Sequence, residues 1–238
     1  MAIDIRPVRV LTDNYAWLLT TDDGIRAVVD PGDAEPIMEV LGGEKLNLIL
    51  LTHHHSDHTM GAEKLKERYG AKIFGPEKNL DLLPPLDRSL GDGESFLLGK
   101  HQVDVLLTPG HAVGHISFVI RDVPALFSGD VLFSAGCGRL LEGSAEELFR
   151  SLHRYDDLPD ETLVCAGHEY TRSNIKFARS VDPDNLDLKR RSEEVEKLLS
   201  ERKPTLPVTL GEERRTNPFL RALNVDIFAQ LRREKDVF

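Results

Sequence analysis

Short apolar runs bounded by turn residues dominate the first two thirds of the chain, a pattern typical of β-strands. Residues 14–20 and 25–30 predict a hairpin around the turn TDDG at 21–24. Further strands are predicted at residues 46–51, 71–74, 103–107, 116–120, 125–127 and 162–166. Apolar residues at helical spacing predict helices at residues 34–41, 58–69 and 145–155. Strands with helices interspersed predict a layered domain of mixed α and β structure, in the α/β (α+β) class.

The pattern changes near residues 166–172. Beyond them, Leu188, Val195, Leu198 and Leu199 repeat at helical spacing, which predicts a helix. Residues 203–217 are predicted as loops and residues 225–235 as a last helix. We therefore divide the chain into a layered domain of residues 1–168 and a small α-helical domain of residues 169–238.

The 238 residues suit one large domain, or one domain with a smaller appendage. Cys137 and Cys165 are too few for the disulfide framework of a secreted protein, which favours a reducing compartment. Residues 1–7 contain neither the basic nor the apolar part of a signal peptide, so a cytoplasmic location is predicted. The strongly apolar stretch at 46–51 is too short to cross a bilayer, which predicts no membrane association.

The formal net charge is −10, from 30 basic and 40 acidic residues, which disfavours nucleic acid as a partner. The charge is uneven, because residues 186–238 hold 12 basic and 10 acidic residues and so carry a net charge of +2. A mildly basic tail on an acidic protein is either a solvated helical face or a surface with a function. Charge alone leaves both interpretations open.

Seven of the nine histidines lie in three short clusters, each placed where a predicted strand ends. The clusters are THHHSDH at 52–58, TPGHAVGH at 108–115 and GHEY at 167–170. The segment SGD at 128–130 adds a carboxylate at another strand end. Loops at one edge of a sheet converge in space, and imidazole and carboxylate are the ligands that zinc, iron and manganese accept.

This set of donors predicts two metal ions rather than one. His53 and His55, two apart on an extended segment, can point to the same side, whereas Asp57 and His58 reach a neighbouring point. Six donors and a shared carboxylate exceed what one tetrahedral ion accepts, so two ions about 3.5–4 Å apart are expected, bridged by a carboxylate and a water. A lone histidine is mostly structural, but seven clustered histidines are a strong metal signal.

Other residues near these clusters are predicted to play supporting or ordinary parts. His54, His115 and Asp30 are predicted to orient ligands rather than to bind metal, although Asp30 could equally be an ordinary turn residue. His101 and His153 lie outside the clusters and are predicted at the surface. Cys137 and Cys165 lack a ligand spacing and are predicted to be small apolar fillers.

The H-x-H-x-D-H core, followed by TPGH, SGD and a later GH, resembles the metallo-β-lactamase superfamily. The resemblance implies a four-layer αββα sandwich with its site at one edge. It also implies a ligand set: one metal takes His53, His55 and His111, the second takes Asp57, His58 and His168, and Asp130 bridges the two.

More specific segments resemble the glyoxalase II (hydroxyacylglutathione hydrolase) family. They are GCGR at 136–139, GHEYT at 167–171, NIKFA at 174–178, NPFLR at 217–221 and RREKD at 232–236. The resemblance implies hydrolysis of S-D-lactoylglutathione to D-lactate and glutathione, the second step of methylglyoxal detoxification. It further implies that glutathione is held by Arg139, Tyr170, Arg232 and Lys235. Some members have an aromatic residue where this chain has Leu141, which predicts one lost ring contact to the substrate.

In the mechanism so implied, the bridging hydroxide attacks the thioester, and Asp57 orients it or accepts its proton as the catalytic carboxylate. Zinc is the first expectation for the metals, and the same donors accept iron or manganese. The main alternative is a glutathione persulfide dioxygenase of the same fold, which uses one iron. A β-lactamase is disfavoured by the absent signal peptide, a nuclease by the net charge, and a non-catalytic binding module by the complete ligand set. A monomer is the default expectation.

Overall fold

Two six-stranded sheets form the centre of the molecule. The computed structural model describes residues 3–238. Met1 and Ala2, which belong to the segment 1–7 that lacks signal-peptide features, lie outside the described residues. In the first sheet the strands follow their chain order and pair antiparallel up to β3 and in parallel from there on. Its strands are β1 (Ile3–Val10), β2 (Asn14–Thr21), β3 (Arg26–Val29), β4 (Leu48–Leu50), β5 (Lys72–Pro76) and β6 (Arg88–Leu90).

The second sheet is built from the middle of the chain and has the order β14-β13-β10-β9-β8-β7. Its strands are β7 (Ser95–Leu98), β8 (His101–Leu107), β9 (Ile116–Ile120), β10 (Ala125–Gly129), β13 (Leu163–Ala166) and β14 (Val208–Thr209). A small hairpin of β11 (Leu132–Phe133) and β12 (Gly136–Cys137) leaves the end of β10. Because β14 comes from the helical region, that region completes the second sheet.

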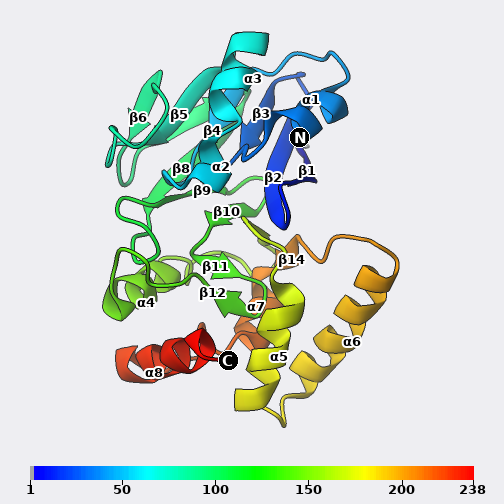
Figure 1. Cartoon of the computed structure of the whole chain (residues 1–238), viewed down its shortest axis with the longest axis vertical. Coiled ribbons are helices and arrows are strands. Elements are labelled where there is room, and N and C mark those ends of the chain that lie inside the picture. Colours follow the sequence, from blue (N-terminus) through cyan, green and yellow to red (C-terminus); the bar gives the residue numbers. More distant parts are fainter. Residues whose placement is uncertain (1–2) are drawn as a thin grey trace.

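Helices cover the outer faces of both sheets, which gives four layers. Figure 1 shows α1 and α3 beside the first sheet, and the helices from α4 to α8 at the other end of the molecule. The helices are α1 (Ala34–Leu41), α2 (Ser56–Thr59), α3 (Ala62–Tyr69), α4 (Ala145–His153), α5 (Thr171–Val181), α6 (Leu186–Ser200), α7 (Leu210–Thr216) and α8 (Val225–Asp236). The predicted αββα architecture followed by helices is confirmed.

Strand β2 shows why the two faces of the first sheet are both buried. Trp17 and Leu19 point into the core between the sheets, whereas Ala16 and Leu18 point into the core under α1 and α3. Side chains alternate along a strand, so a strand covered on both faces must be apolar throughout. The core between the sheets continues to Phe228 of α8, so the helical region shares it. Within residues 3–238, no helix has the length and apolar character needed to cross a membrane.

Several predicted elements differ from the structure. The helix expected at 58–69 is broken into α2 and α3, because the N–H of Gly61 bonds to Pro31 O instead of continuing the helix. A Cβ at Gly61 would lie 2.5 Å from that oxygen, so only glycine fits this close approach. The prediction of loops at residues 203–217 is wrong, because this segment contains β14 and α7. Strands β1, β6, β7, β11 and β12 and helix α5 had no prediction.

A buried carboxyl group ties α7 to the β11–β12 hairpin. Glu213 accepts hydrogen bonds from Ser134 Oγ at 3.0 Å, Ala135 N at 2.7 Å and Asn217 Nδ2 at 2.9 Å. Its side chain is fully buried, and burial raises the pKa of Glu213 to about 7 in spite of these donors. The hairpin that leads into residues 136–139 therefore depends on a titratable contact.

We expect Glu213→Gln to change how stability depends on pH. The pKa of Glu213 in the folded state, about 7, lies above the ordinary 4.5, so the free energy of unfolding falls as pH rises through that interval. Gln keeps a carbonyl acceptor and does not titrate. The stability of the wild type relative to the variant should be about 2 kcal/mol greater near pH 5 than near pH 8. Urea unfolding at both pH values checks this, and an equal difference at both would contradict it.

Candidate metal centre and substrate pocket

The predicted ligands do converge, although they come from four loops far apart in the sequence. His53 and its neighbours follow β4, His111 follows β8, Asp130 follows β10 and His168 follows β13. Their donor atoms form two groups of three, each within 4.8 Å of one another: His53, His55 and His111; and Asp57, His58 and His168.

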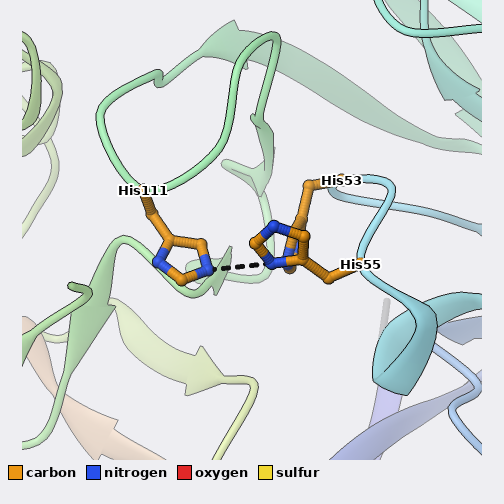
Figure 2. Close-up of side chains that lie close together, drawn as sticks. All are labelled: His53, His55 and His111. Carbon is orange, nitrogen blue, oxygen red and sulfur yellow. Dashed lines mark hydrogen bonds between the residues drawn. The ribbon is translucent and has the colours of Figure 1, made fainter. Parts of the chain in front are cut away.

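The first group has the spacing of ligands around a tetrahedral ion. Figure 2 shows the rings of His53, His55 and His111 turned toward a common point. His55 Nδ1 lies 3.1 Å from His53 Nε2 and 3.1 Å from His111 Nε2. Ligands about 2.0–2.1 Å from a tetrahedral zinc lie about 3.3 Å from each other, so these three nitrogens fit around one ion.

The second group has a similar spacing. Asp57 Oδ2 lies 3.5 Å from His58 Nε2 and 3.4 Å from His168 Nε2. Asn14, which the sequence did not single out, donates from Nδ2 to Asp57 Oδ2 at 2.9 Å and fixes that carboxylate. Two imidazoles and a carboxylate form a donor set suited to a divalent ion.

Asp130 lies between the groups. Its Oδ1 is 3.4 Å from His58 Nε2, and its Oδ2 is 3.2 Å from His168 Nε2 and 3.5 Å from His111 Nε2. Asp130 Oδ1 and His58 Nε2 are both buried and have no hydrogen-bond partner among residues 3–238. Orphaned buried polar atoms are costly, and a cation between them removes that cost. The residues present therefore fit a metal centre.

Each of these five histidines also uses its other ring nitrogen. His58 Nδ1 donates to Asp30 Oδ2 at 3.1 Å, His168 Nδ1 to Asp13 Oδ1 at 2.9 Å and His111 Nδ1 to Arg139 O at 2.9 Å. His53 Nδ1 contacts Thr52 Oγ1 at 2.9 Å, and His55 Nε2 contacts Glu142 Oε1 at 3.0 Å. Such contacts fix the tautomer and leave the inward nitrogen free to bind a metal.

The charges of the centre are strongly coupled. Burial, then repulsion from His58, holds the pKa of His53 well below its usual value. Burial alone would raise the pKa of Asp130, but His58 and His168 hold it well below the ordinary range, so this carboxylate stays ionised. Burial opposes protonation of His168, yet Asp130 and Asp57 raise its pKa to about 10. Protons and metal ions therefore compete for this site.

Of the three residues predicted to orient ligands, Asp30 and His115 contact the donor residues, whereas His54 contacts Glu142. Asp30 accepts hydrogen bonds from Thr52 N at 2.8 Å and Thr52 Oγ1 at 2.7 Å, besides His58 Nδ1. It therefore contacts histidines of both groups, directly or through Thr52. His115 Nε2 accepts from Asp130 N at 3.2 Å.

The structure corrects one prediction outside the clusters. His101 was expected at the surface but is fully buried, and its Nδ1 is hydrogen-bonded to Asp122 Oδ2 at 2.7 Å. His153 is exposed, as predicted. Cys137 and Cys165 are both buried, as expected of apolar fillers.

A cavity of about 550 Å³ opens beside the histidine and aspartate donors of the two groups, between the loops of the two sheets and the helical region. It is lined by Arg139, Tyr170, Arg232 and Lys235, the four residues that the family resemblance implied, and also by Leu141. The Tyr170 ring stacks on His168 with ring centroids 4.6 Å apart. Burial raises the pKa of Tyr170 to about 12, so its hydroxyl remains a hydrogen-bond donor.

The three cations of the cavity are not equivalent. Arg139 is exposed, and its guanidinium has no partner within residues 3–238. Lys235 donates from Nζ to Ser173 O at 3.2 Å. Arg232 is buried, and its terminal nitrogens already bond to Cys137 O at 3.0 Å and Asp236 Oδ1 at 2.9 Å, while its Nε has no partner in the described chain. Arg139 and Lys235 therefore remain the most available to an anion.

Comparisons with known proteins agree with this geometry. A family model described as the metallo-beta-lactamase superfamily matches residues 10–168, and one described as the hydroxyacylglutathione hydrolase C-terminus matches residues 169–238. A curated hydroxyacylglutathione hydrolase of Acidiphilium cryptum is 47% identical over 236 residues, which cover 98% of this chain and 96% of that protein. The chain belongs to the hydroxyacylglutathione hydrolase family. Another family member, from Ruegeria pomeroyi, is 44% identical over 255 residues and is covered completely, as is this chain.

Solved structures show the same fold. TTHA1623, crystallised in a di-iron-bound form, has a TM-score of 0.67 and 29% identity, and the match covers 90% of this chain and 99% of that one. ETHE1 from Myxococcus xanthus has a TM-score of 0.74 and 24% identity, with 97% of this chain and 90% of that chain covered. Membership of the metallo-beta-lactamase superfamily, together with the converging donors, supports binding of divalent metal ions.

We expect Asp30→Asn to weaken metal binding in the second group most. Its amide nitrogen would face His58 Nδ1, so the His58 proton would have to move to Nε2, where it blocks the metal position. Loss of such a supporting contact lowers metal affinity about 10- to 100-fold. Equilibrium dialysis with metal analysis measures the affinity, and the exposed Asp184→Asn is the matched control. Unchanged affinity in a folded Asp30→Asn protein would refute this role.

Proposed function

We propose that this protein hydrolyses thioesters of glutathione, foremost S-D-lactoylglutathione, at a centre of two divalent metal ions. The proposal rests on a single cavity whose lining includes members of both donor triads together with the cations Arg139 and Lys235. Such a cavity suits a reactive bond attached to an anionic carrier, and glutathione carries two carboxylates. Full-length relatives named hydroxyacylglutathione hydrolase support the same substrate class.

In this proposal His53, His55 and His111 hold one ion, Asp57, His58 and His168 hold the other, and Asp130 binds both. Bound divalent ions would lower the pKa of water to about 7 and polarise the thioester carbonyl. Zinc is the first candidate, and the same imidazole and carboxylate donors accept iron or manganese.

The reaction is the addition of water across a thioester. The water oxygen attacks the carbonyl carbon, the carbon–sulfur bond breaks, and the products are a carboxylic acid and the thiol of glutathione. Asp57, held by Asn14, is placed to accept a hydrogen bond from the attacking water and to orient it. A hydrogen bond from His168 and the charge of His58 outweigh burial and keep the pKa of Asp57 below its usual value, so the carboxylate is ionised and ready to accept. A thiolate leaves readily, so no strong general acid is needed.

Binding of the carrier positions the reacting carbonyl. Arg139 and Lys235 would pair with glutathione carboxylates, and the Tyr170 hydroxyl would donate to a peptide carbonyl. Arg232 can add only its Nε, because Cys137 O and Asp236 occupy its terminal nitrogens. A cytoplasmic location and a monomeric state remain predictions of the sequence.

The direct test is thioester hydrolysis in the presence and absence of oxygen. Water is the only co-substrate of the proposed reaction, so the rate with S-D-lactoylglutathione should be the same in air and under nitrogen. Oxygen uptake with glutathione persulfide is the counter-test for the dioxygenase alternative. Rapid uptake together with poor thioester hydrolysis would overturn the proposal.

A second prediction concerns the cations of the cavity. Charge-assisted hydrogen bonds contribute about 1.5–3 kcal/mol and less when exposed, so Arg139→Ala and Lys235→Ala should each lower kcat/KM roughly 5- to 100-fold. Most of the loss should appear in KM, because the contact exists in both ground and transition states.

Two controls make that prediction specific. A small thioester without glutathione carboxylates should be hydrolysed at nearly the same rate by these variants and the wild type. Arg221→Ala, at a cation whose partner is Asp182 outside the cavity, should leave KM for the glutathione thioester unchanged. Wild-type KM values in both cavity variants would show that neither Arg139 nor Lys235 binds the carrier.

A further inference from the structure

Glu142 lies in the segment that follows β12, and neither the ligand set nor the substrate contacts account for it. Its Oε1 accepts hydrogen bonds from His55 Nε2 and from His54 Nε2, each at 3.0 Å. Its Oε2 accepts from Val113 N at 2.8 Å. One carboxylate thus connects the loop of His53–His55 with the loop that carries His111.

His55 differs from the other four histidines of the centre in the nitrogen that it turns inward. His53, His58, His111 and His168 present Nε2, whereas His55 presents Nδ1. The far end of its ring therefore points outward, and its side chain is 21% exposed, compared with 1% for His58 and 5% for His168. Packing restrains this ring less than the others.

Three of the other four inward-facing histidines contact backbone or buried side-chain oxygens, whereas His168 contacts the 42% exposed Asp13. The buried oxygens include the backbone oxygen of Arg139 for His111 and the buried Asp30 for His58. For His55 the outward nitrogen has, among residues 3–238, Glu142 as its one hydrogen-bond partner, and the Glu142 side chain is 29% exposed. If that acceptor were lost, the ring could rotate or move its proton to Nδ1, and either change would remove a ligand from the first group.

We propose that Glu142 is the positioning residue that fixes His55 for metal binding in the first group. The inference rests on the proposed metal centre and adds a residue that sets the affinity of one half of it. Glu142 also belongs to the segment 139–142, whose Arg139 O orients His111 and whose Arg139 and Leu141 side chains line the cavity. The segment 139–142 therefore orients two of the three first-group histidines and also lines part of the cavity.

The test compares metal affinity in two backgrounds. In His168→Ala only the first group has its full donor set, and in His111→Ala only the second group does. Glu142→Leu removes both acceptors at similar size and should lower the cobalt(II) affinity about 10- to 100-fold in the first background. It should leave the affinity in the second background unchanged. Competition with a chromophoric chelator gives the affinities without any substrate.

Two further variants separate positioning from a structural role. Glu142→Gln keeps one carbonyl acceptor and should restore most of the affinity that Glu142→Leu loses. Glu146→Gln, on the exposed face of α4, is the matched control and should have no effect. In the otherwise unmodified protein, kcat of Glu142→Leu should recover with excess metal while KM changes less than about twofold.

Equal losses of affinity in both backgrounds would make Glu142 a general structural residue. No loss in either background would make its contact with His54 and His55 an ordinary surface ion pair. Either result overturns the proposal. If the metal affinities changed as expected but the wild-type protein did not hydrolyse the thioester, only the proposed function would be contradicted.

Discussion

Every histidine that faces the centre must be oriented through its other ring nitrogen, and the surrounding loops are built to meet that requirement. An imidazole without such a partner can change tautomer and present a proton where a metal should bind. A buried donor left without an acceptor costs about 1–3 kcal/mol, so the partners are also needed for stability. Asp30 alone orients a histidine of each group, because it bonds His58 directly and reaches His53 through Thr52.

The position of the centre follows from the two sheets. Loops after β4, β8, β10 and β13 bring the donors together, so no single segment holds more than part of the ligand set. The helical region then closes the cavity with Tyr170, Arg232 and Lys235. The helical region shares the core and contributes β14, so it is fixed relative to the histidine and aspartate donors. This rigidity suits a site that must hold the carrier and the reacting bond at once.

The sequence predicts what depends on local spacing and fails where distant contacts decide. Strands β2–β5, β8–β10 and β13, helices α1 and α4 and the donor motifs could be predicted, because apolar periodicity and ligand spacing are local. The break at Gly61 could not, since it depends on Pro31 packed against it. Likewise, Glu142 and Asn14 lie 87 and 43 residues from the side chains that they orient, in segments without a motif. The burial of Arg232 also escapes prediction, because the same basic residue could lie in a solvated helix.

Anomalous scattering from crystals grown with zinc would show directly how many metal ions the centre binds and where. A binuclear centre should give two peaks about 3.5–4 Å apart, one among His53, His55 and His111 and the other among Asp57, His58 and His168, with Asp130 between them. A single fully occupied peak, or zinc bound away from these side chains, would contradict it.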